Sequence, residues 1–400
     1  MLKGKTVAPL TLCCKVNQYE TDGMIELLKE AGMTAVSFEE KADVYLINTC
    51  SVTNMADKKS RQMIHRAKKL NPDAVVIAAG CYVQAAKDKL MEDDRISIII
   101  GNNKKKDIVQ ILEDYLEIGV TDEGMLDIAA EKEYEPLTIN STLEHTRAYV
   151  KIQDGCNQFC SYCIIPYVRG RIRSRELASI TEEVERLAQT GVKEIVLTGI
   201  HISSYGKDKE NEVGLADVID AISKIESIER IRLGSLEPGI ITDTFIDRIV
   251  DNKKVCPHFH LSLQSGCNTV LKRMNRKYTC EEYFEKCEML RKAFDRPALT
   301  TDVIVGFPGE TDEEFQETVD YLTKLNLYEM HIFKFSPRQG TVAAGMRNQI
   351  GPEFKNQRSD VLLALSEKNK HAYEASFRGE TLEVLVEEKV RRNGKNGYRG

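Results

Sequence analysis

The stretch Asp154-Gly155-Cys156-Asn157-Gln158-Phe159-Cys160-Ser161-Tyr162-Cys163 carries three cysteines at the spacing C-x3-C-x2-C. Sulfur-rich ligation suits iron–sulfur clusters, and three thiolates hold three irons of a [4Fe-4S] cube while the fourth iron stays open. A structural zinc knuckle is the alternative, but no fourth Cys or His follows closely after Cys163. The stretch therefore predicts a cluster with one reactive iron.

Length and composition describe an ordinary globular chain of two or three domains, with 400 residues. The sequence has neither a long apolar run nor a secretory leader, so we expect a cytoplasmic protein that does not enter a membrane. Eleven cysteines in such a chain favour metal ligands and buried thiols over disulfides. The net charge of -6, from 56 basic and 62 acidic residues, restricts nucleic-acid contact to local basic patches.

The first eighty residues alternate between strands and helices. Three apolar segments are predicted as strands: Lys5–Leu12, Val44–Thr49 and Val75–Gly80. Two intervening segments are predicted as helices: Tyr19–Ala31 and Ala56–Leu70. This alternation predicts a parallel sheet with helices on both faces, in which ligands collect beyond the carboxyl ends of the strands.

A cysteine follows each predicted strand, at Cys14, Cys50 and Cys81. Their separations of 36 and 31 residues match about one strand-helix repeat, so neighbouring strands could deliver three thiolates to one point. Three unrelated buried cysteines are the alternative, because Cys is among the most buried residue types. The sharper hypothesis is a second three-thiolate [4Fe-4S] cluster.

The three-cysteine stretch, with Tyr162 just before its last cysteine, resembles the signature of the radical S-adenosylmethionine (SAM) superfamily. The segments Thr11–Glu20, Asn48–Thr53 and Ala79–Cys81 resemble the N-terminal domain of the methylthiotransferases, the two-cluster branch of that superfamily. Cys14 matches the ligand position, while the preceding residue, usually Gly in the family, is Cys13 here.

The resemblance implies two [4Fe-4S] clusters and SAM as cofactors. The open iron at Cys156, Cys160 and Cys163 would chelate SAM and cleave it to a 5'-deoxyadenosyl radical. The other cluster would hold sulfur that is methylated by another SAM and then transferred to carbon as a methylthio group.

A second strand-helix series begins after Thr146. Its predicted strands are Ala148–Gln153, Glu194–Thr198, Arg230–Ser235, Phe259–Leu263, Thr301–Val305 and His331–Phe335. Six such units predict a parallel barrel with its chemistry at the carboxyl ends of the strands, and the resemblance implies the partial (β/α)6 form. Residues at these ends, with Tyr162, are the predicted SAM contacts: Tyr162, Gly199, Ser235, Glu237, Gln264 and Asp302. A strand-end turn or helix cap is the alternative for any of them. His201, in the same region, is interpreted as a hydrogen-bonded wall residue rather than a base.

Two basic segments lie near the predicted clusters. One holds the predicted substrate contacts Arg169, Arg171, Arg173 and Arg175, which follow the three-cysteine stretch and could grip phosphate or carboxylate. The other is the predicted helix with Lys58, Lys59, Arg61, His65, Arg66, Lys68 and Lys69. A solvated face is the usual alternative for a charge run. Together they favour an anionic polymer held over both clusters.

The fold class is therefore α/β, and four parts are expected. They are an N-terminal three-layer parallel-sheet domain at 1–125, a linker at 126–145, a radical SAM barrel with a trailing helix at 146–376, and the start of a TRAM domain at 377–400. The acidic segment from about Asp107 to Thr142 is interpreted as the connection. A charged helix is expected over Pro352–Phe377, and Glu380–Glu387 is expected to form the first strand of the incomplete RNA-binding β-barrel.

Within the family, the flanks Cys14–Glu20 and Ser161–Arg175 look most like the enzyme acting on N6-threonylcarbamoyladenosine at position 37 of tRNA. The partners implied are the tRNA anticodon loop, a flavodoxin- or ferredoxin-like electron donor and a sulfur source. Alternatives are a methylthiotransferase on isopentenyladenosine-37 or on a ribosomal-protein aspartate. A two-cluster electron-transfer or cluster-carrier protein is the alternative of another class.

Overall fold

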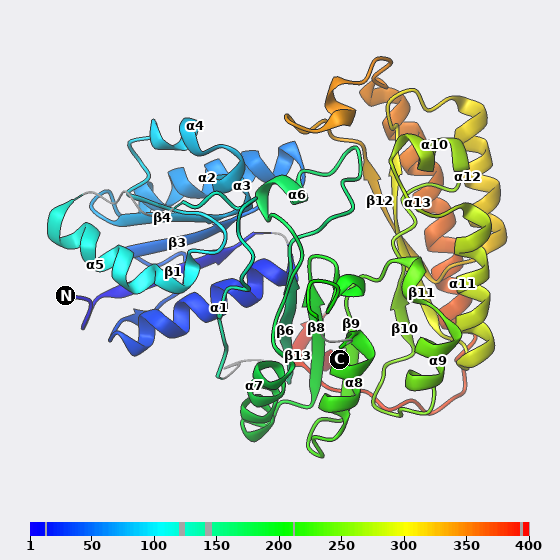
Figure 1. The fold of residues 1–400 in the computed structure, drawn as a ribbon, viewed down its shortest axis with the longest axis horizontal. Coiled ribbons are helices and arrows are strands. Elements are labelled where there is room, and N and C mark those ends of the chain that lie inside the picture. Colours follow the sequence, from blue (N-terminus) through cyan, green and yellow to red (C-terminus); the bar gives the residue numbers. More distant parts are fainter. Residues whose placement is uncertain (13, 120–124, 141–145, 211–212, 393–394, 400) are drawn as a thin grey trace.

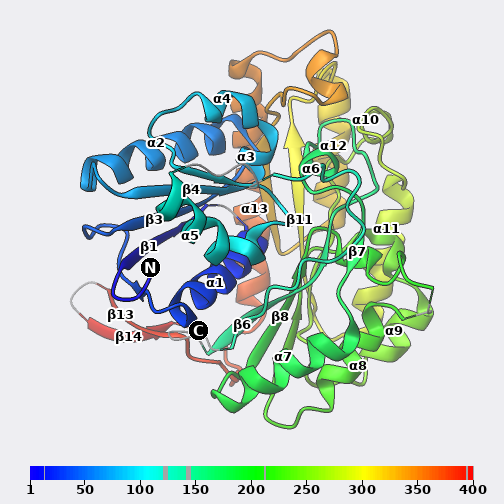
Figure 2. The ribbon, with the colours of Figure 1, turned by 60° about the vertical axis from the view of Figure 1, so that its left-hand side comes forward.

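Two α/β units lie side by side and are followed by a short hairpin (Figures 1 and 2). A computed structural model describes residues 1–12, 14–119, 125–140, 146–210, 213–392 and 395–399. No helix within these ranges is long and apolar enough to cross a membrane.

The N-terminal unit is built on a five-stranded parallel sheet in the order β2-β1-β3-β4-β5. Its strands are β1 Thr6–Thr11, β2 Thr34–Ala35, β3 Val44–Thr49, β4 Val75–Gly80 and β5 Ile98–Ile100. Helix α2 (Asn54–Leu70) covers one face, and α1 (Lys15–Glu30) and α5 (Ile108–Ile118) cover the other (Figure 1). Each face has its own apolar cluster, which explains the continuous apolar runs in the central strands.

The three strands predicted in this unit are confirmed, but the segment after Asp107 is not simply a connection. Helix α5 buries Ile108, Ile111 and Leu112 in the core of the unit, while its acidic residues face outward. These outward acidic residues explain why the sequence after Asp107 looked like a connection between domains. The acidic residues 122–124 lie outside the described residues. Two short helices, α3 (Cys81–Ala85) and α4 (Lys87–Met91), complete the unit.

Six parallel strands and one short antiparallel strand, β7 (Arg173–Ser174), which pairs with the first of them, form the wall of the second unit. The parallel strands are β6 Arg147–Asp154, β8 Glu194–Gly199, β9 Arg230–Leu233, β10 His258–His260, β11 Ala298–Val305 and β12 Glu329–Lys334. Strand β8 pairs with β6 on one side and with β9 on the other, and β11 likewise pairs with β10 and β12. Isolated bridges from Ile231 to Val255 and from Leu236 to Leu261 join the two groups. Among the described residues β6 does not pair with β12, so the wall is an open, partial barrel, as predicted.

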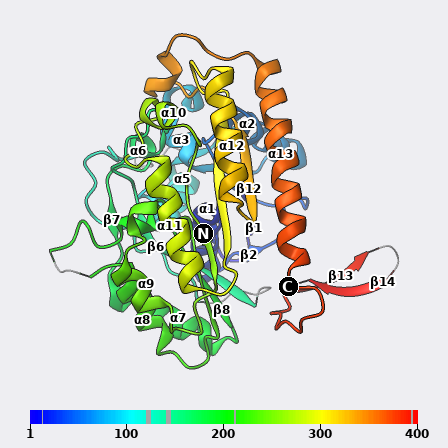
Figure 3. The ribbon, with the colours of Figure 1, turned by 90° about the vertical axis from the view of Figure 1, so that its right-hand side faces the viewer.

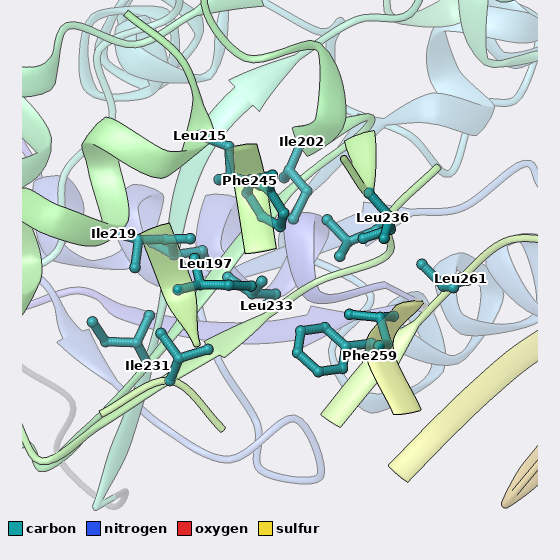
Figure 4. Close-up of a cluster of buried hydrophobic side chains, with 14 of the residues drawn as sticks. Leu197, Ile202, Leu215, Ile219, Ile231, Leu233, Leu236, Phe245, Phe259 and Leu261 are labelled. Atoms are coloured by element: carbon teal, nitrogen blue, oxygen red, sulfur yellow. The ribbon is translucent and has the colours of Figure 1, made fainter. Parts of the chain in front are cut away.

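Helices cover the outside of this wall (Figures 1 and 3). They include α7 Leu177–Gln189, α8 Leu215–Ser223, α9 Asp243–Ile249, α11 Cys280–Ala293, α12 Asp312–Leu325 and α13 Pro352–Ala375. Figure 4 shows part of the apolar cluster between strands and helices, to which Leu197, Leu233, Phe259, Ile219 and Phe245 all belong. This close-packed layer fixes the strands, and therefore the loops at their carboxyl ends.

The chain after α13 differs from expectation. Residues 381–387 carry no regular element, and the first strand is β13 (Glu388–Arg392), paired antiparallel with β14 (Lys395–Arg399). The alternating Leu382, Val384 and Val386 gave the strand pattern, but these side chains are exposed. Alternation alone does not make a strand, because a ladder needs a partner.

Candidate iron–sulfur and SAM site

The first cysteine trio, Cys156, Cys160 and Cys163, lies in the loop between β6 and helix α6 (Ile165–Val168). Gly155 opens this loop with a φ of +70°, and a Cβ atom there would come within 1.7 Å of the Arg171 carbonyl oxygen. Only glycine fits this combination of conformation and contact. The loop thus turns sharply at the carboxyl end of β6, where barrel enzymes place their chemistry.

N–H groups donate to two sulfurs of the first trio. The Gln158 amide donates to Cys156 Sγ at 3.5 Å, and Arg276 Nη1 donates to Cys160 Sγ at 3.2 Å. Burial raises the pKa of Cys156 to about 11 and that of Cys163 to about 12. Such thiols keep their protons until a metal displaces them, and the surrounding donors then stabilise the thiolates.

The second trio, Cys14, Cys50 and Cys81, lies at the carboxyl-end edge of the N-terminal sheet. Cys50 follows β3 and Cys81 follows β4, whose last residues, Thr49 and Gly80, are directly paired. Cys14 is the N-cap of α1, and its Sγ accepts from the Asn17 amide at 3.4 Å. Cys13 lies outside the described residues.

Asn17 ties the loop of Cys14 to the loop of Cys50. Its Nδ2 donates to the Leu12 and Thr49 carbonyl oxygens, both at 3.0 Å. Burial raises the pKa of Cys14 to about 11, an effect that the charge of Arg169 opposes. The Cys81 sulfur is held from the barrel side, where Arg169 Nε donates to it at 3.2 Å. The second trio therefore lies at the boundary between the two units.

Three of the four arginines predicted to bind substrate are inside the protein. Arg169 contacts Glu20 and Asp154, Arg173 lies 3.8 Å from Asp154, and Arg175 pairs with Glu183. The expectation that all four line the mouth of the site is therefore wrong, because buried carboxylates already engage these three. Arg171 alone of the four is exposed, with its guanidinium 4.5 Å from the Phe159 ring centroid in the three-cysteine loop.

Of the residues predicted to contact SAM, Tyr162 belongs to the three-cysteine loop and Glu237 contacts it, whereas the other four lie elsewhere on the barrel. Glu237 lies against the three-cysteine loop: its Oε2 accepts from Gln158 Nε2 at 2.8 Å, and its Oε1 is 3.6 Å from Arg276. His201 bonds both Glu237, at 3.1 Å, and Ser204, at 2.6 Å, as its interpretation as a wall residue requires. Tyr162 packs edge-on to Phe307 with ring centroids 6.4 Å apart.

The other predicted SAM contacts have no contact with the three-cysteine loop among the described hydrogen bonds and ion pairs. Asp302 lies between His260, at 3.3 Å, and His331, at 3.7 Å. Gln264 has a φ of +77° and is buried, Ser235 is exposed, and the backbone at Gly199 is crowded by the Gln153 carbonyl oxygen. Gly199 ends β8, and Ser235 and Gln264 follow β9 and β10, whereas Asp302 lies inside β11.

Sequence reasoning missed Arg276 and Arg338, which hold the cysteine loops. Arg338 Nη2 donates to Ser51 Oγ and Asp57 Oδ2, both at 2.7 Å, next to Cys50. Arg276 belongs to a segment with several basic residues, Lys272, Arg273 and Lys277, whereas Arg338 is the one basic residue of its segment, and nothing in the sequence shows that either is buried. The role of these two arginines becomes visible only from their contacts in the folded structure.

The donor set fits two iron–sulfur cubes. A cube takes three thiolates, each on a different iron, and each trio offers three cysteines. Each trio also has N–H donors aimed at sulfur, which iron–sulfur centres use to stabilise charge.

Comparison with known proteins agrees with this geometry. The Radical SAM superfamily model matches residues 150–322, and the model of uncharacterized protein family UPF0004 matches residues 6–101. The threonylcarbamoyladenosine tRNA methylthiotransferase MtaB of Bacillus subtilis is 43% identical over 96% of this chain and 85% of its own length. The tRNA-2-methylthio-N(6)-dimethylallyladenosine synthase of Alkaliphilus oremlandii is 36% identical over 96% and 83%, respectively.

Among solved structures, the radical SAM methyltransferase TsrM of Kitasatospora setae has a TM-score of 0.62 at 16% identity, over 85% of this chain and 77% of that one. At this identity the likeness concerns the fold alone. The extent of the sequence matches and the order of the two cysteine trios lead to one conclusion: the chain belongs to the methylthiotransferase family of radical SAM enzymes.

Proposed function

We propose that the protein methylthiolates C2 of N6-threonylcarbamoyladenosine at position 37 of tRNA, in the cytoplasm. The relatives named for threonylcarbamoyladenosine are 36–43% identical, two of them at 43% and 40%, whereas the relatives named for dimethylallyladenosine are 36–37% identical. The observation that carries the chemistry is Arg169, which joins a sulfur of the second trio to Asp154, two residues before the first trio. Both trios therefore serve one site.

When bound, the cluster on the first trio supplies the electron that cleaves SAM to a carbon radical, and the cluster on the second trio carries the sulfur. The protein's own task is placement, since such a radical abstracts whichever hydrogen lies within reach. Gln158, Glu237 and Arg276 form one group against the three-cysteine loop, in which Gln158 donates a hydrogen bond to Glu237 and Arg276 forms an ion pair with it. This group would orient SAM there, with Tyr162, Gly199, Ser235, Gln264 and Asp302 as further contacts.

Arg171 is the proposed contact for the anionic substrate. Its side chain is exposed beside the three-cysteine loop, and a guanidinium binds a carboxylate or phosphate bidentately. On the N-terminal unit, the exposed basic residues of α2, among them Lys58, Lys59 and Arg66, provide further cationic groups. An anticodon-loop base splayed from its stack would enter between them, as single-stranded RNA permits. We further propose that residues 377–400 begin a TRAM-type RNA-binding domain.

A reductant of flavodoxin or ferredoxin type and a separate sulfur source complete the proposal. The test is mass analysis of tRNA nucleosides from cells that lack and then regain the gene. A methylthio increment that returns on threonylcarbamoyladenosine is the expected result. An increment on isopentenyladenosine or on a ribosomal protein would assign one of the alternative substrates, and reduced protein that forms no 5'-deoxyadenosine from SAM would point to an electron carrier.

A further inference from the structure

Arg169 is at the centre of a buried ionic network between the two units. Its side chain is 0% exposed. Nε donates to Cys81 Sγ at 3.2 Å, Nη1 donates to Glu20 at 2.7 Å and Asp154 at 3.2 Å, and Nη2 donates to Asn17 Oδ1 at 2.8 Å. One guanidinium thus touches helix α1, the end of β6 and a ligand of the second trio.

The network holds more positive than negative charge. Glu20 also contacts Lys105 at 3.0 Å and Lys151 at 2.7 Å, and Lys151 contacts Asp154 at 2.6 Å. Among the described residues the buried cations of this group are Lys105, Lys151, Arg169 and Arg173, and the buried carboxylates are Glu20, Glu135 and Asp154. One cation is in excess, and a buried charge without a counterion costs several kcal/mol.

The missing counterion lies in the direction of Cys81. Five of the six hydrogen bonds that the Arg169 side chain donates go to Glu20, Asp154 and the Asn17 amide oxygen, and the remaining one goes to the Cys81 sulfur. Three thiolates carry more negative charge than an oxidised cube carries positive charge, so a cluster on the second trio is an anion. Each electron that it accepts adds to that charge, and a cation at hydrogen-bond distance favours the reduced form.

The same guanidinium also sets geometry. Asp154 is the last residue of β6, and Cys156 follows two residues later. A planar fork of donors holds Cys81, Glu20 and Asp154 in fixed relative positions, which the single ammonium group of a lysine cannot do.

We propose that Arg169 is a positioning residue for the second centre: it raises the reduction potential of a cluster on Cys14, Cys50 and Cys81 and fixes Cys81 relative to the three-cysteine loop. The inference rests on the proposed two-cluster function. It gives Arg169 a role other than contact with substrate.

The charge effect is tested in a full-length chain whose first trio is replaced by Ala, so that only the second centre remains. Arg169→Gln, Arg169→Lys and the control Arg171→Gln are introduced, and each reconstituted protein is titrated with a reductant while EPR follows the cluster. Arg169→Gln should shift the midpoint potential downward, Arg169→Lys should stay close to the parent, and Arg171→Gln should not differ from it.

The geometric effect is tested in the chain with all six cysteines. Arg169→Lys should form less methylthio product per 5'-deoxyadenosine than the parent, because charge is kept and the fork is lost. Failure of Arg169→Gln to hold iron while Arg169→Lys holds it would also support the proposal.

Two outcomes would overturn the inference while leaving the proposed function intact. One is an Arg169→Gln protein that loads its iron and titrates at the parent potential. The other is equal loss of iron and of thermal stability in both Arg169 variants, which would make the arginine only a fold-holding residue. A parent chain that binds no iron at the second trio would instead contradict the proposed function itself.

Discussion

Arg338 Nη2 donates to Asp57 Oδ2 at 2.7 Å, across the boundary between the barrel and the N-terminal unit. The same arginine donates to Asn54 and to Ser51, the residue after Cys50. A few residues later, the Ala343 amide donates to the Ser161 carbonyl oxygen in the three-cysteine loop at 2.7 Å. The segment after β12 therefore touches a loop of each trio.

Replacing Arg338 by Ala should deplete iron from the second trio. The Asp57 carboxylate, whose side chain is 15% exposed, would lose its partner, and the Cys50 loop would be freed. The cost is below the roughly 3–5 kcal/mol of a fully buried pair. Iron content and 5'-deoxyadenosine formation are measured together. We expect iron to fall toward half while SAM cleavage persists. Arg248→Ala, at an exposed arginine that pairs with Asp217 and Asp220, is the matched control. Unchanged iron in Arg338→Ala would contradict this role.

Replacing Arg276 by Gln should act on the first trio instead. The side chain is buried, bonds Cys160 Sγ at 3.2 Å, and lies 3.6 Å from Glu237. Loss of such an outer contact typically lowers metal affinity or activity 10–100-fold, so we expect SAM cleavage to fall by about that factor. The neighbouring Lys277→Gln, whose Nζ bonds only Asn275 among the described contacts, should cleave SAM at the parent rate. Equal rates in the two variants would argue against Arg276.

Replacing Cys14, Cys50 and Cys81 together by Ala should separate the two centres. We expect about eight irons per chain in the reconstituted parent and about four in the variant, because each cube holds four. 5'-Deoxyadenosine formation should continue, and methylthio transfer should stop. If cleavage vanished while circular dichroism showed a folded chain, the proposed division of labour would be wrong.

His258 should make stability depend on pH. Burial, with the charge of Arg232, lowers the pKa of His258 from 6.5 to about 4. The unfolded chain then binds the extra proton between these values, so stability is complete above pH 6.5 and is lost as the pH falls toward 4. Between pH 7.5 and 5.5 this amounts to about 1 kcal/mol. Urea midpoints should show a shallower pH dependence in His258→Gln, and an unchanged slope would assign the dependence elsewhere.

Much of the fold could be predicted because parallel strands end at one edge. The spacing of Cys14, Cys50 and Cys81 reported the strand-helix repeat directly, and the structure sets these residues at that edge. Strand β5 was not predicted because Ile98–Ile100 is only three residues long. Helix α5 was not predicted because the acidic residues on its outer face obscure the apolar pattern of its inner face.

The arginine run shows what the sequence could not reveal. Arg169, Arg173 and Arg175 look like a solvated or ligand-facing charge run because the sequence does not show which carboxylates meet them. Glu20 is 149 residues from Arg169, whereas Arg173 and Arg175 pair with the nearer Asp154 and Glu183. Burial of a charge depends on whether such a partner meets it in space. Only Arg171, which has no described carboxylate partner, keeps the exposed position that the run suggested.

Helix α1 carries a cysteine of the second trio and also residues that contact the rest of the chain outside the N-terminal unit. Its N-cap is Cys14, its next turns hold Asn17 and Glu20, and Tyr19 bonds the Leu137 carbonyl oxygen at 2.6 Å outside the unit. In a chimera that combined the N-terminal unit of one family member with the barrel of another, the residues of α1 would therefore meet contact residues from a different protein. Such hybrids should assemble the cluster of the second trio only when α1 and β6 come from the same parent protein. The N-terminal unit and the barrel should therefore be exchanged only together.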